Sequence, residues 1–354
     1  MARPHGFPPP GSDAVNEIPA DPFNERTGRL RRRWHTVLGI PVCFESDSAE
    51  LLALADAAFA GGGRRGAPVA RACRVRLRLA PTGRTNTTFG TAGRGRRPAR
   101  PKLFSGGGVL GCAMDADNFA TVVPALARAC VSVSPPMLRF HYLVRYELLE
   151  FAVLTLLSRV HGLVPLHAGC FGAGRRAVLV IGGSGAGKST LCLEALAQGL
   201  ELVAEDSVFV RARSLGASGL NSYLYMRNSS LAFARGELAE GLRTAPRIRR
   251  RSGVRKAMLD LRGGEFRLAA RPLRIAAVVS LVPRATGAAP LRRIGAARIG
   301  AVLDATQAYA RRQPGWREFR ARVARLPAFE LSRVPPTDAV RMLHGLLSHK
   351  GRDP

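Results

Sequence analysis

The spacing of hydrophobic and polar residues predicts strands and helices from about residue 31 onward. Residues 1–28 are rich in Pro, Gly, Asp and Asn, which is typical of a flexible tail. The next segment, Trp34–Phe44, is apolar and β-like. An Ala- and Leu-rich helix is expected over Ala49–Ala60, with Ser46, Asp47 and Ser48 as candidate N-caps and Gly61-Gly62-Gly63 at its end. Cys73–Leu79 alternates Arg with apolar residues, as a half-exposed strand does.

Two longer apolar segments follow, and both are expected to be helices. They are Phe119–Ala129 and Val144–Val160. The second is apolar almost all round, so we expect it to be buried. Before them, Arg84–Gly108 is dominated by Gly, Arg, Pro and Thr, which indicates a long loop with room for a broken hairpin.

Short strands and helices alternate after residue 163. Two strands joined by a turn lead into a glycine loop: Val164–Phe171, the turn Gly172–Arg176, and Ala177–Ile181. Then come, in order, the helix Thr190–Gln198, the strands Leu200–Ala204 and Val208–Val210, a basic stretch to Arg255, the strands Ala257–Leu261 and Ile275–Val282, the helix Ile299–Arg312, and the helix Thr337–His349 with Thr337 as its N-cap.

Composition excludes several classes of protein. The chain has 354 residues, of which 46% are hydrophobic, so it is long enough to bury one large core or two smaller ones. Its six cysteines are scattered without a CxxC pair, which fits neither a zinc site nor a disulfide framework. No apolar run approaches ~18 residues, and the first residues do not resemble a secretory signal, so we expect a cytoplasmic protein without a membrane partner.

The net charge of +29 is the strongest compositional bias. A positive field attracts polyanions such as nucleic acids. However, only four of the 54 basic residues are lysine, and arginines occur in every segment rather than along one stripe. The charge therefore indicates a bias of the whole surface, and a nucleic-acid partner is not expected.

The most specific motif is a glycine loop, Gly182-Gly183-Ser184-Gly185-Ala186-Gly187-Lys188-Ser189, which fits G-x-x-x-x-G-K-[ST]. A β-branched strand precedes it and a helical segment follows. In this motif the backbone N–H groups form an anion nest, the lysine reaches the β- and γ-phosphates, and the Ser hydroxyl binds Mg²⁺. A glycine-rich turn with a chance lysine is the alternative, and the strand–loop–helix context disfavours it.

Two carboxylates and a histidine are the other candidates for chemistry. Glu205-Asp206 ends a predicted strand beside the loop, at the edge where α/β sheets bind ligands. Only 18 residues separate Lys188 from Asp206, whereas many P-loop ATPases and helicases place their acidic strand much farther along. His167 lies in an apolar strand before the loop, where it fits either a core histidine or a functional one.

Together these residues resemble the catalytic domain of HPr kinase/phosphorylase and the wider group of HPr-kinase-related kinases. The shared order is a histidine, a turn, an apolar strand, a GxSGxGKS loop, a helix that ends in Gly, and a strand that ends in an acidic pair. Here these are His167, Gly172–Arg176, Ala177–Ile181, Gly182–Ser189, Gly199 and Glu205-Asp206. The resemblance is strong over Leu166–Phe209 and looser elsewhere. It is closer to related kinases of peptide-tailoring and polysaccharide-associated gene neighbourhoods than to HPr kinase itself.

The resemblance implies a fold and a set of site residues. The fold is α/β: a P-loop kinase core of the HPr kinase/PEP carboxykinase-like type in residues 163–354, after a tail (1–30) and an α+β region (31–162). The implied cofactors are ATP and Mg²⁺. The triphosphate would be held by Gly183, Ser184, Gly185, Ala186, Gly187, Lys188, Ser189 and Thr190, and the metal by Ser189 and Asp206. His167, Glu205, Asp206 and Lys188 would surround the transferred phosphoryl group, one carboxylate acting as the base toward the acceptor.

Departures from the family pattern change some of these expectations. Glu205 stands where the family usually has Asp, so the sequence leaves open which of Glu205 and Asp206 is the base. Thr190 stands where HPr kinase has Glu, and the downstream glycine-rich segment of that enzyme is absent, so HPr is not the expected acceptor. Transferred phosphoryl groups attract further cations, and Arg247–Lys256 offers them. Lys256 is our candidate, with a solvated basic loop as the alternative.

The sequence therefore predicts an ATP-dependent kinase that phosphorylates a hydroxyl, either a serine of a peptide or protein or a small alcohol. A homo-oligomer is common in the family. The alternatives are a nucleotide-binding regulatory or scaffold protein without transfer activity and, in third place, a P-loop ATPase stimulated by nucleic acid. The last is disfavoured because the chain lacks helicase-type motifs and has only 6% aromatic residues for base stacking.

Overall fold

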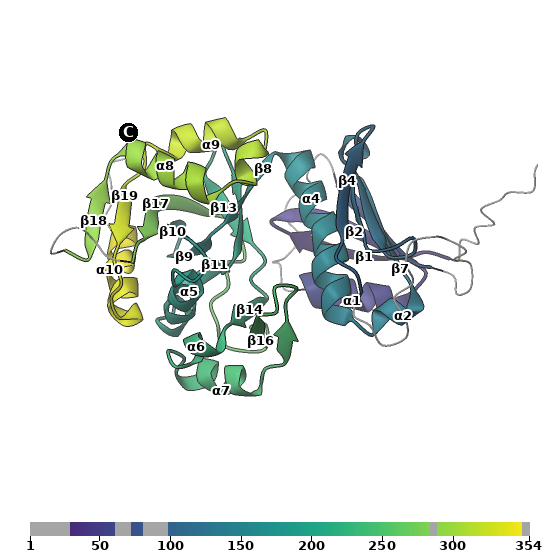
Figure 1. Ribbon diagram of the computed structural model, residues 1–354, viewed down its shortest axis with the longest axis horizontal. Helices are drawn as coiled ribbons and strands as arrows, with labels where there is room; N and C mark the ends of the chain where they lie inside the picture. Colours follow the sequence, from purple (N-terminus) through teal and green to yellow (C-terminus); the bar gives the residue numbers. More distant parts are fainter. Residues whose placement is uncertain (1–28, 61–71, 81–97, 284–288, 349–354) are drawn as a thin grey trace, which may run out of the picture.

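The computed structural model describes residues 29–60, 72–80, 98–283 and 289–348. The expected tail over residues 1–28, the three glycines after the first helix, and residues 84–97 of the expected loop lie outside these ranges. The described residues form a mixed α/β structure. It contains a seven-stranded sheet, a nine-stranded sheet and a small antiparallel sheet, and both large sheets include parallel strand pairs (Figure 1).

The seven-stranded sheet is built from the first part of the chain, in the order β1-β2-β3-β7-β6-β5-β4. The helices α1 and α4 pack on it and share its apolar core, and α4 lies on the side turned toward the rest of the molecule (Figure 1). The elements are β1 (Arg31–Val37), β2 (Ile40–Ser46), α1 (Ala49–Phe59), β3 (Cys73–Leu79), β4 (Lys102–Gly106), β5 (Val109–Ala113), β6 (Phe119–Val123), η1 (Pro124–Leu126), β7 (Arg128–Val133), α2 (Pro135–Leu138), α3 (His141–Leu143), the π-helical η2 (Val144–Leu149) and α4 (Glu150–His161).

The segment Trp34–Phe44, expected as one strand, belongs to a hairpin. Leu38 and Gly39 both have positive φ angles, 54° and 76°, and form the two-residue turn between β1 and β2. Such turns match the twist of the strands they join, which explains why an apolar run folds back on itself. The following helix begins where the sequence predicts, because Ser48 caps α1 by accepting a hydrogen bond from the N–H of Leu51 at 3.3 Å.

The predicted helix Phe119–Ala129 is wrong. The segment forms β6, a single 3₁₀ turn and the start of β7. Thr121–Val123 is β-branched and so favours a strand, and Pro124 stands at the first position of the 3₁₀ turn. Ala127 then adopts a left-handed conformation, with φ of 52°, which reverses the chain. Apolar content alone does not distinguish a buried helix from two short strands.

The nine-stranded sheet and the small sheet come from the second part of the chain. The main path of the large sheet is β11-β9-β10-β17-β13-β12-β8, with β19 also paired to β17 and β18 to β19. The small sheet has the order β14-β16-β15. The elements are β8 (Leu163–His167), β9 (Gly169–Ala173), β10 (Arg176–Ile181), α5 (Lys188–Ala197), β11 (Glu201–Ala204), β12 (Ser207–Arg211), β13 (Gly216–Gly219), β14 (Tyr223–Met226), α6 (Asn228–Leu231), α7 (Gly236–Thr244), β15 (Arg247–Arg249), β16 (Arg255–Asp260), β17 (Leu273–Leu281), β18 (Leu291–Ile294), α8 (Ala296–Thr306), η3 (Ala310–Arg312), α9 (Trp316–Val323), β19 (Ala328–Leu331) and α10 (Pro336–Ser348).

The central strand β10 is buried on both faces. Leu179 and Ile181 belong to the core that includes residues of α8 and α9, whereas Val178 and Val180 belong to the core that includes residues of α5 and α10. This alternation follows from the two-residue period of a strand. A strand covered on both faces is apolar throughout, which is why the run of residues 177–181 is so distinct in the sequence.

Several boundaries in this part differ from the predicted ones. The expected strand Val164–Phe171 is divided at Ala168 into β8, which pairs with β12, and β9, which pairs with β10 and β11. The expected helix Ile299–Arg312 is interrupted between α8 and η3. Thr337 lies inside α10 rather than at its N-cap, because that helix begins at Pro336. The basic stretch before Arg255 also contains strands and helices that the sequence pattern did not predict.

Within the described ranges, no helix combines the length and apolar character needed to cross a membrane.

Candidate functional site

The glycine loop, residues 182–187, joins β10 to α5. Gly185 and Gly187 have φ angles of 80° and 108°, a region that side chains with a Cβ rarely adopt. Residues 183–186 are exposed, and no side chain of the described segments caps the N-terminus of α5. The first N–H groups of a helix have no partner within it, so α5 presents them at the loop. An exposed loop at an uncapped helix N-terminus suits a phosphate group.

Lys188 is buried at the start of α5, with its charge inside the loop. Its Nζ donates hydrogen bonds to the carbonyl oxygens of Gly182 at 2.8 Å and Gly183 at 3.1 Å. Burial lowers the pKa of Lys188, and the neighbouring carboxylates of Asp206 and Glu205 oppose that change. The ammonium group is therefore held beside both the loop and the acidic pair.

Glu205 is buried against the first turn of α5. Ser189 Oγ donates a hydrogen bond to Glu205 Oε1, and Lys256 Nζ lies 3.9 Å from the same oxygen. Glu205 Oε2 is buried and has no hydrogen-bond partner among the described residues. Burial raises the pKa of Glu205, and the charge of Lys256 opposes that rise. A buried carboxylate oxygen without a donor, next to a serine hydroxyl, is a fitting pair of ligands for Mg²⁺.

Ser189 and Asp206 are the metal ligands expected from the sequence, whereas the structure brings Ser189 against Glu205. Across the part of the chain that the structure describes, no group of three or more His, Cys, Asp and Glu side chains could hold a metal. Ser189 and Glu205 would supply only part of a coordination shell. Magnesium commonly takes the remaining ligands from substrate phosphates and water.

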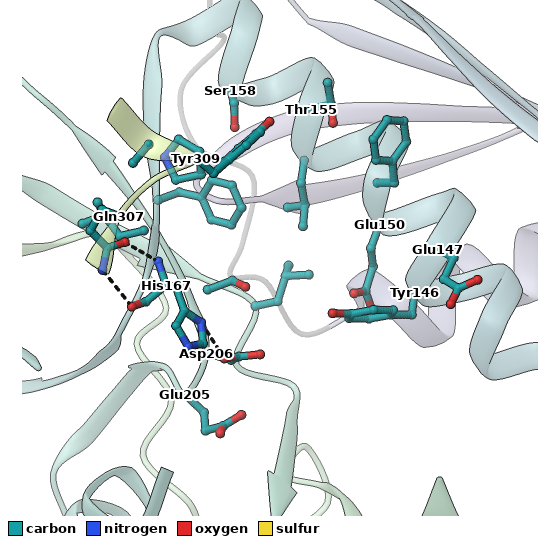
Figure 2. Close-up of a pocket in the computed structure, with 18 of the residues that line it drawn as sticks. Tyr146, Glu147, Glu150, Thr155, Ser158, His167, Glu205, Asp206, Gln307 and Tyr309 are labelled. Atoms are coloured by element: carbon teal, nitrogen blue, oxygen red, sulfur yellow. Dashed lines mark hydrogen bonds and ion pairs between the residues drawn. The ribbon is translucent and has the colours of Figure 1, made fainter. Parts of the chain in front are cut away.

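Asp206 makes two ion-pair contacts, one with each carboxylate oxygen. His167 Nδ1 lies 2.9 Å from Oδ1, and Arg250 Nη1 lies 3.4 Å from Oδ2 (the His167 contact is dashed in Figure 2). Burial alone would raise the pKa of Asp206. The hydrogen bond and charge of His167, with the charges of Arg250 and Lys256, outweigh burial and hold that pKa well below its usual range. Asp206 is therefore an ionised carboxylate in a fixed orientation.

Gln307 fixes the position of His167. The backbone N–H of His167 donates to Gln307 Oε1 at 2.8 Å, and Gln307 Nε2 donates to the carbonyl oxygen of His167 at 3.1 Å (Figure 2). The side-chain amide thus pairs with the outer edge of β8 as another strand would. On the inner edge His167 lies opposite Ser207, next to Asp206. His167 is held from both sides at the end of its strand.

Arg250 and Lys256 come from the small sheet, at its β15–β16 turn and on β16. The guanidinium group of Arg250 lies 5.3 Å from the ring centres of both Tyr146 and Tyr225. Burial lowers the pKa of Lys256, and the charge of Glu205 opposes this. Of the basic stretch that the sequence analysis singled out, these two residues reach the acidic pair. Arg250 had no signal that distinguished it from its neighbours.

A pocket of about 750 Å³ lies beside the acidic pair. One wall comes from η2 and α4 of the first part of the chain, and the other from β8, the β11–β12 turn and residues 306–310. Figure 2 shows Tyr146, Glu150, Thr155 and Ser158 across the pocket from His167 and Asp206. This pocket could not be expected from the sequence, because its two walls are built by segments far apart in the chain.

The structure brings most of the predicted site residues together. Ser189 and Lys256 lie against Glu205, and His167 lies against the adjacent Asp206. Lys188 is close enough for the charges of both carboxylates to act on it. Gly183, Ser184, Gly185, Ala186 and Gly187 form the adjoining loop. Thr190 points elsewhere, since its hydroxyl donates to Ser230 Oγ on α6 at 3.3 Å. Gln307 is an addition that depends on tertiary contacts, and such contacts also distinguish Arg250 from the other arginines of the basic stretch.

Comparisons with known proteins add little to this geometry. No family model matches the chain, and no curated protein matches it. Among solved structures, the Hpr(Ser) kinase/phosphatase from Coxiella burnetii is similar over 51% of this chain and 92% of that chain, with 13% sequence identity and a TM-score of 0.28.

Proposed function

We propose that this protein is a kinase that transfers the γ-phosphoryl group of a nucleoside triphosphate to a hydroxyl group. The observation that carries the proposal is the different surroundings of the two adjacent carboxylates. Both line the pocket, which is large enough for an acceptor, but they are held differently. Glu205 has a side chain that is only 3% exposed and lies against Ser189 at the start of α5, whereas the Asp206 side chain is 28% exposed and is held by His167 and Arg250. A phosphate site and an acceptor site would thus meet at one acidic pair.

The loop residues and Lys188 are suited to binding the triphosphate. Backbone N–H groups of residues 183–190 would contact its oxygens, and Lys188 would exchange the carbonyls of Gly182 and Gly183 for the β- and γ-phosphates. Ser189 and Glu205 would hold Mg²⁺, which when bound neutralises part of the phosphate charge. Lys256 and Arg250 add positive charge near the group in transfer, where charge spreads over three oxygens.

Asp206 is our candidate for the base. Its carboxylate would accept a hydrogen bond from the acceptor hydroxyl and take its proton as the hydroxyl oxygen bonds to the γ-phosphorus. The bond from that phosphorus to the bridging oxygen of the β-phosphate breaks, and the nucleoside diphosphate leaves with the electron pair. His167 and Arg250 would hold the carboxylate in line. In this assignment Glu205, rather than Asp206, is the carboxylate ligand of the metal.

Phosphoryl transfer from γ-labelled ATP to a library of alcohols and serine peptides tests the proposal, with the full chain and Mg²⁺. We expect labelled product from the native protein and from Lys102→Ala, which changes an exposed lysine on β4. We expect Asp206→Asn to lower transfer by about 10²–10⁴-fold while nucleotide still binds. Lys188→Ala should lose nucleotide binding as well. Nucleotide binding without transfer to any acceptor would instead support a regulatory or scaffold role.

A further inference from the structure

The pocket beside Asp206 has a mostly apolar lining. Aliphatic and aromatic side chains come from α4, β8, β12 and the chain after β13: Phe151, Leu154, Pro165, Leu166, Phe209 and Leu220. Tyr309, which is 59% exposed, lies at its rim, and Thr155 and Ser158 direct their hydroxyl groups toward it (Figure 2). Its volume of about 750 Å³ is in the range of pockets that enclose small molecules.

Most charged groups that line the pocket already have partners, and the exception, Glu205 Oε2, is the proposed ligand of the metal. Glu147 accepts two hydrogen bonds from Arg251, at 2.7 and 2.6 Å. Glu150 lies 3.4 Å from Arg145 Nε, and burial raises the pKa of Glu150 to about 7. Away from that metal ligand, a charged occupant would lose water here without finding an opposite charge that is not already engaged, which is unfavourable. The lining therefore favours an uncharged occupant.

The strand edge in this pocket is not open to an added strand. β8 is the last strand on its side of the sheet, as far as the described residues show. Pro165 has no N–H to donate, and Gln307 occupies both backbone groups of His167. An extended peptide that adds to a sheet edge needs those groups. The occupant would therefore enter with one end first and make contacts through its apolar surface.

We infer that this pocket binds the acceptor, and that the acceptor hydroxyl is carried by an uncharged aromatic or aliphatic group the size of a small molecule or of a peptide end. This inference rests on the proposed kinase activity, because it places the hydroxyl at Asp206. Thr155 and Ser158 lie on the opposite wall, where they can bind a polar atom at the far end of the acceptor. The apolar side chains between the two ends select against charged acceptors.

A panel of matched acceptors tests the selectivity. One arm uses free alcohols whose bodies are aromatic, aliphatic, carboxylate-bearing or ammonium-bearing. The other uses short peptides, blocked at both ends, with serine next to Phe and Leu, to Asp, or to Lys. We expect kcat/KM to be about tenfold or more higher for the uncharged apolar members of at least one arm. The arm whose members receive the labelled phosphate shows whether the acceptor is a free alcohol or a peptide. Equal or better transfer to the charged members would overturn the inference.

Two variants test whether the selectivity for uncharged acceptors arises in this pocket. Thr155→Glu adds a charge to the α4 wall, and Tyr309→Ala removes an exposed ring, so neither changes a fully buried side chain. Both should lower kcat/KM for the preferred acceptor by about tenfold while the affinity for ATP stays the same. Thr244→Glu, an exposed position near the end of α7, is the matched control. Unchanged kcat/KM in both pocket variants would contradict the inference.

A direct binding measurement separates this inference from the proposed function. Calorimetric titration of the native chain with an uncharged aromatic alcohol, in the presence of a nucleoside triphosphate that cannot transfer its phosphate, should give binding that Thr155→Glu weakens. Such binding without transfer of label would reject the kinase activity and keep the pocket assignment. Transfer of label without this selective binding would keep the kinase activity and reject the pocket assignment. If neither is seen, both are wrong.

Discussion

His167 Nδ1 lies 2.9 Å from Asp206 Oδ1. His167 is the last residue of β8, and Asp206 lies in the turn between β11 and β12. Arg250 contacts the second oxygen of the same carboxylate from a third segment. These contacts restrict the rotation of the Asp206 side chain. A carboxylate with a fixed orientation loses less entropy when it aligns an acceptor, which makes this contact important for the proposed transfer.

His167→Ala should lower kcat without weakening nucleotide binding. Arg250 alone would then orient Asp206, so we expect a loss of about 10–100-fold, smaller than the loss for Asp206→Asn. The double variant should be no slower than Asp206→Asn, because His167 acts through that carboxylate. Steady-state kinetics with the labelled acceptor measure all three variants.

His344 provides the control for this substitution, since it is an exposed histidine on α10. His344→Ala should leave kcat unchanged. Additive losses in the His167→Ala/Asp206→Asn double variant would show that the histidine acts independently of Asp206. A rise in the KM for nucleotide in His167→Ala would show instead that His167 helps to bind the triphosphate.

Glu205→Gln should raise the Mg²⁺ concentration needed for half-maximal transfer. The substitution keeps the shape of the side chain and removes the charge beside Ser189, so we expect a shift of about tenfold or more. A titration of Mg²⁺ at saturating nucleotide measures it. The same titration with Asp206→Asn is the comparison. If the shift occurs there and not in Glu205→Gln, then Asp206 is the metal ligand, as the family resemblance implies.

Sequence patterns predicted best those parts of the protein that local chemistry determines. The glycine loop, the apolar strand before it and the acidic pair are each a short run of consecutive residues, and these elements occur near where the sequence places them. The helix predicted over Phe119–Ala129 was wrong because a buried helix and two short buried strands share an apolar composition. The ends of the expected strand Val164–Phe171 were also wrong, because its division at Ala168 depends on pairing with β12 and β10.

The parts of the site that the sequence did not reveal are all tertiary contacts. Arg250 is one of many arginines in a basic stretch, and only folding of the small sheet brings it to Asp206. Gln307 lies 140 residues from His167 and replaces a strand partner. The pocket wall formed by Tyr146 depends on how α4 and η2 lie against the second part of the chain. No local pattern carries that information.

Arg251→Ala should destabilise the contact between the two parts of the chain. Arg251 donates to both carboxylate oxygens of Glu147 and to the carbonyl oxygens of Pro98 and Ala99. Loss of a partly buried, charge-assisted network of this kind costs about 2–3 kcal/mol. Urea unfolding measures the free energy. Arg243→Ala is the control, because solvent screens its exposed pair with Glu240 on α7 and the pair contributes little to stability. Equal losses in the two variants would contradict the prediction.

Glu150→Gln should make the protein more stable than the native chain at alkaline pH. At acidic pH the substitution should change the free energy of unfolding less. Burial raises the pKa of Glu150 from an ordinary value of 4.5 to about 7. Between these values the folded state holds a proton that the unfolded state releases, so the native chain loses stability as pH rises through that window. Gln carries no such proton, and Arg145 keeps its contact with Tyr225 in the variant. The free energy of unfolding of Glu150→Gln relative to the native chain should therefore increase by up to about 3 kcal/mol between pH 4.5 and pH 8.

Urea unfolding at pH 5, 6, 7 and 8 measures this, with Glu237→Gln as an exposed control on α7. A constant difference between variant and native chain across this range would show that Glu150 is already ionised in the folded protein near pH 5.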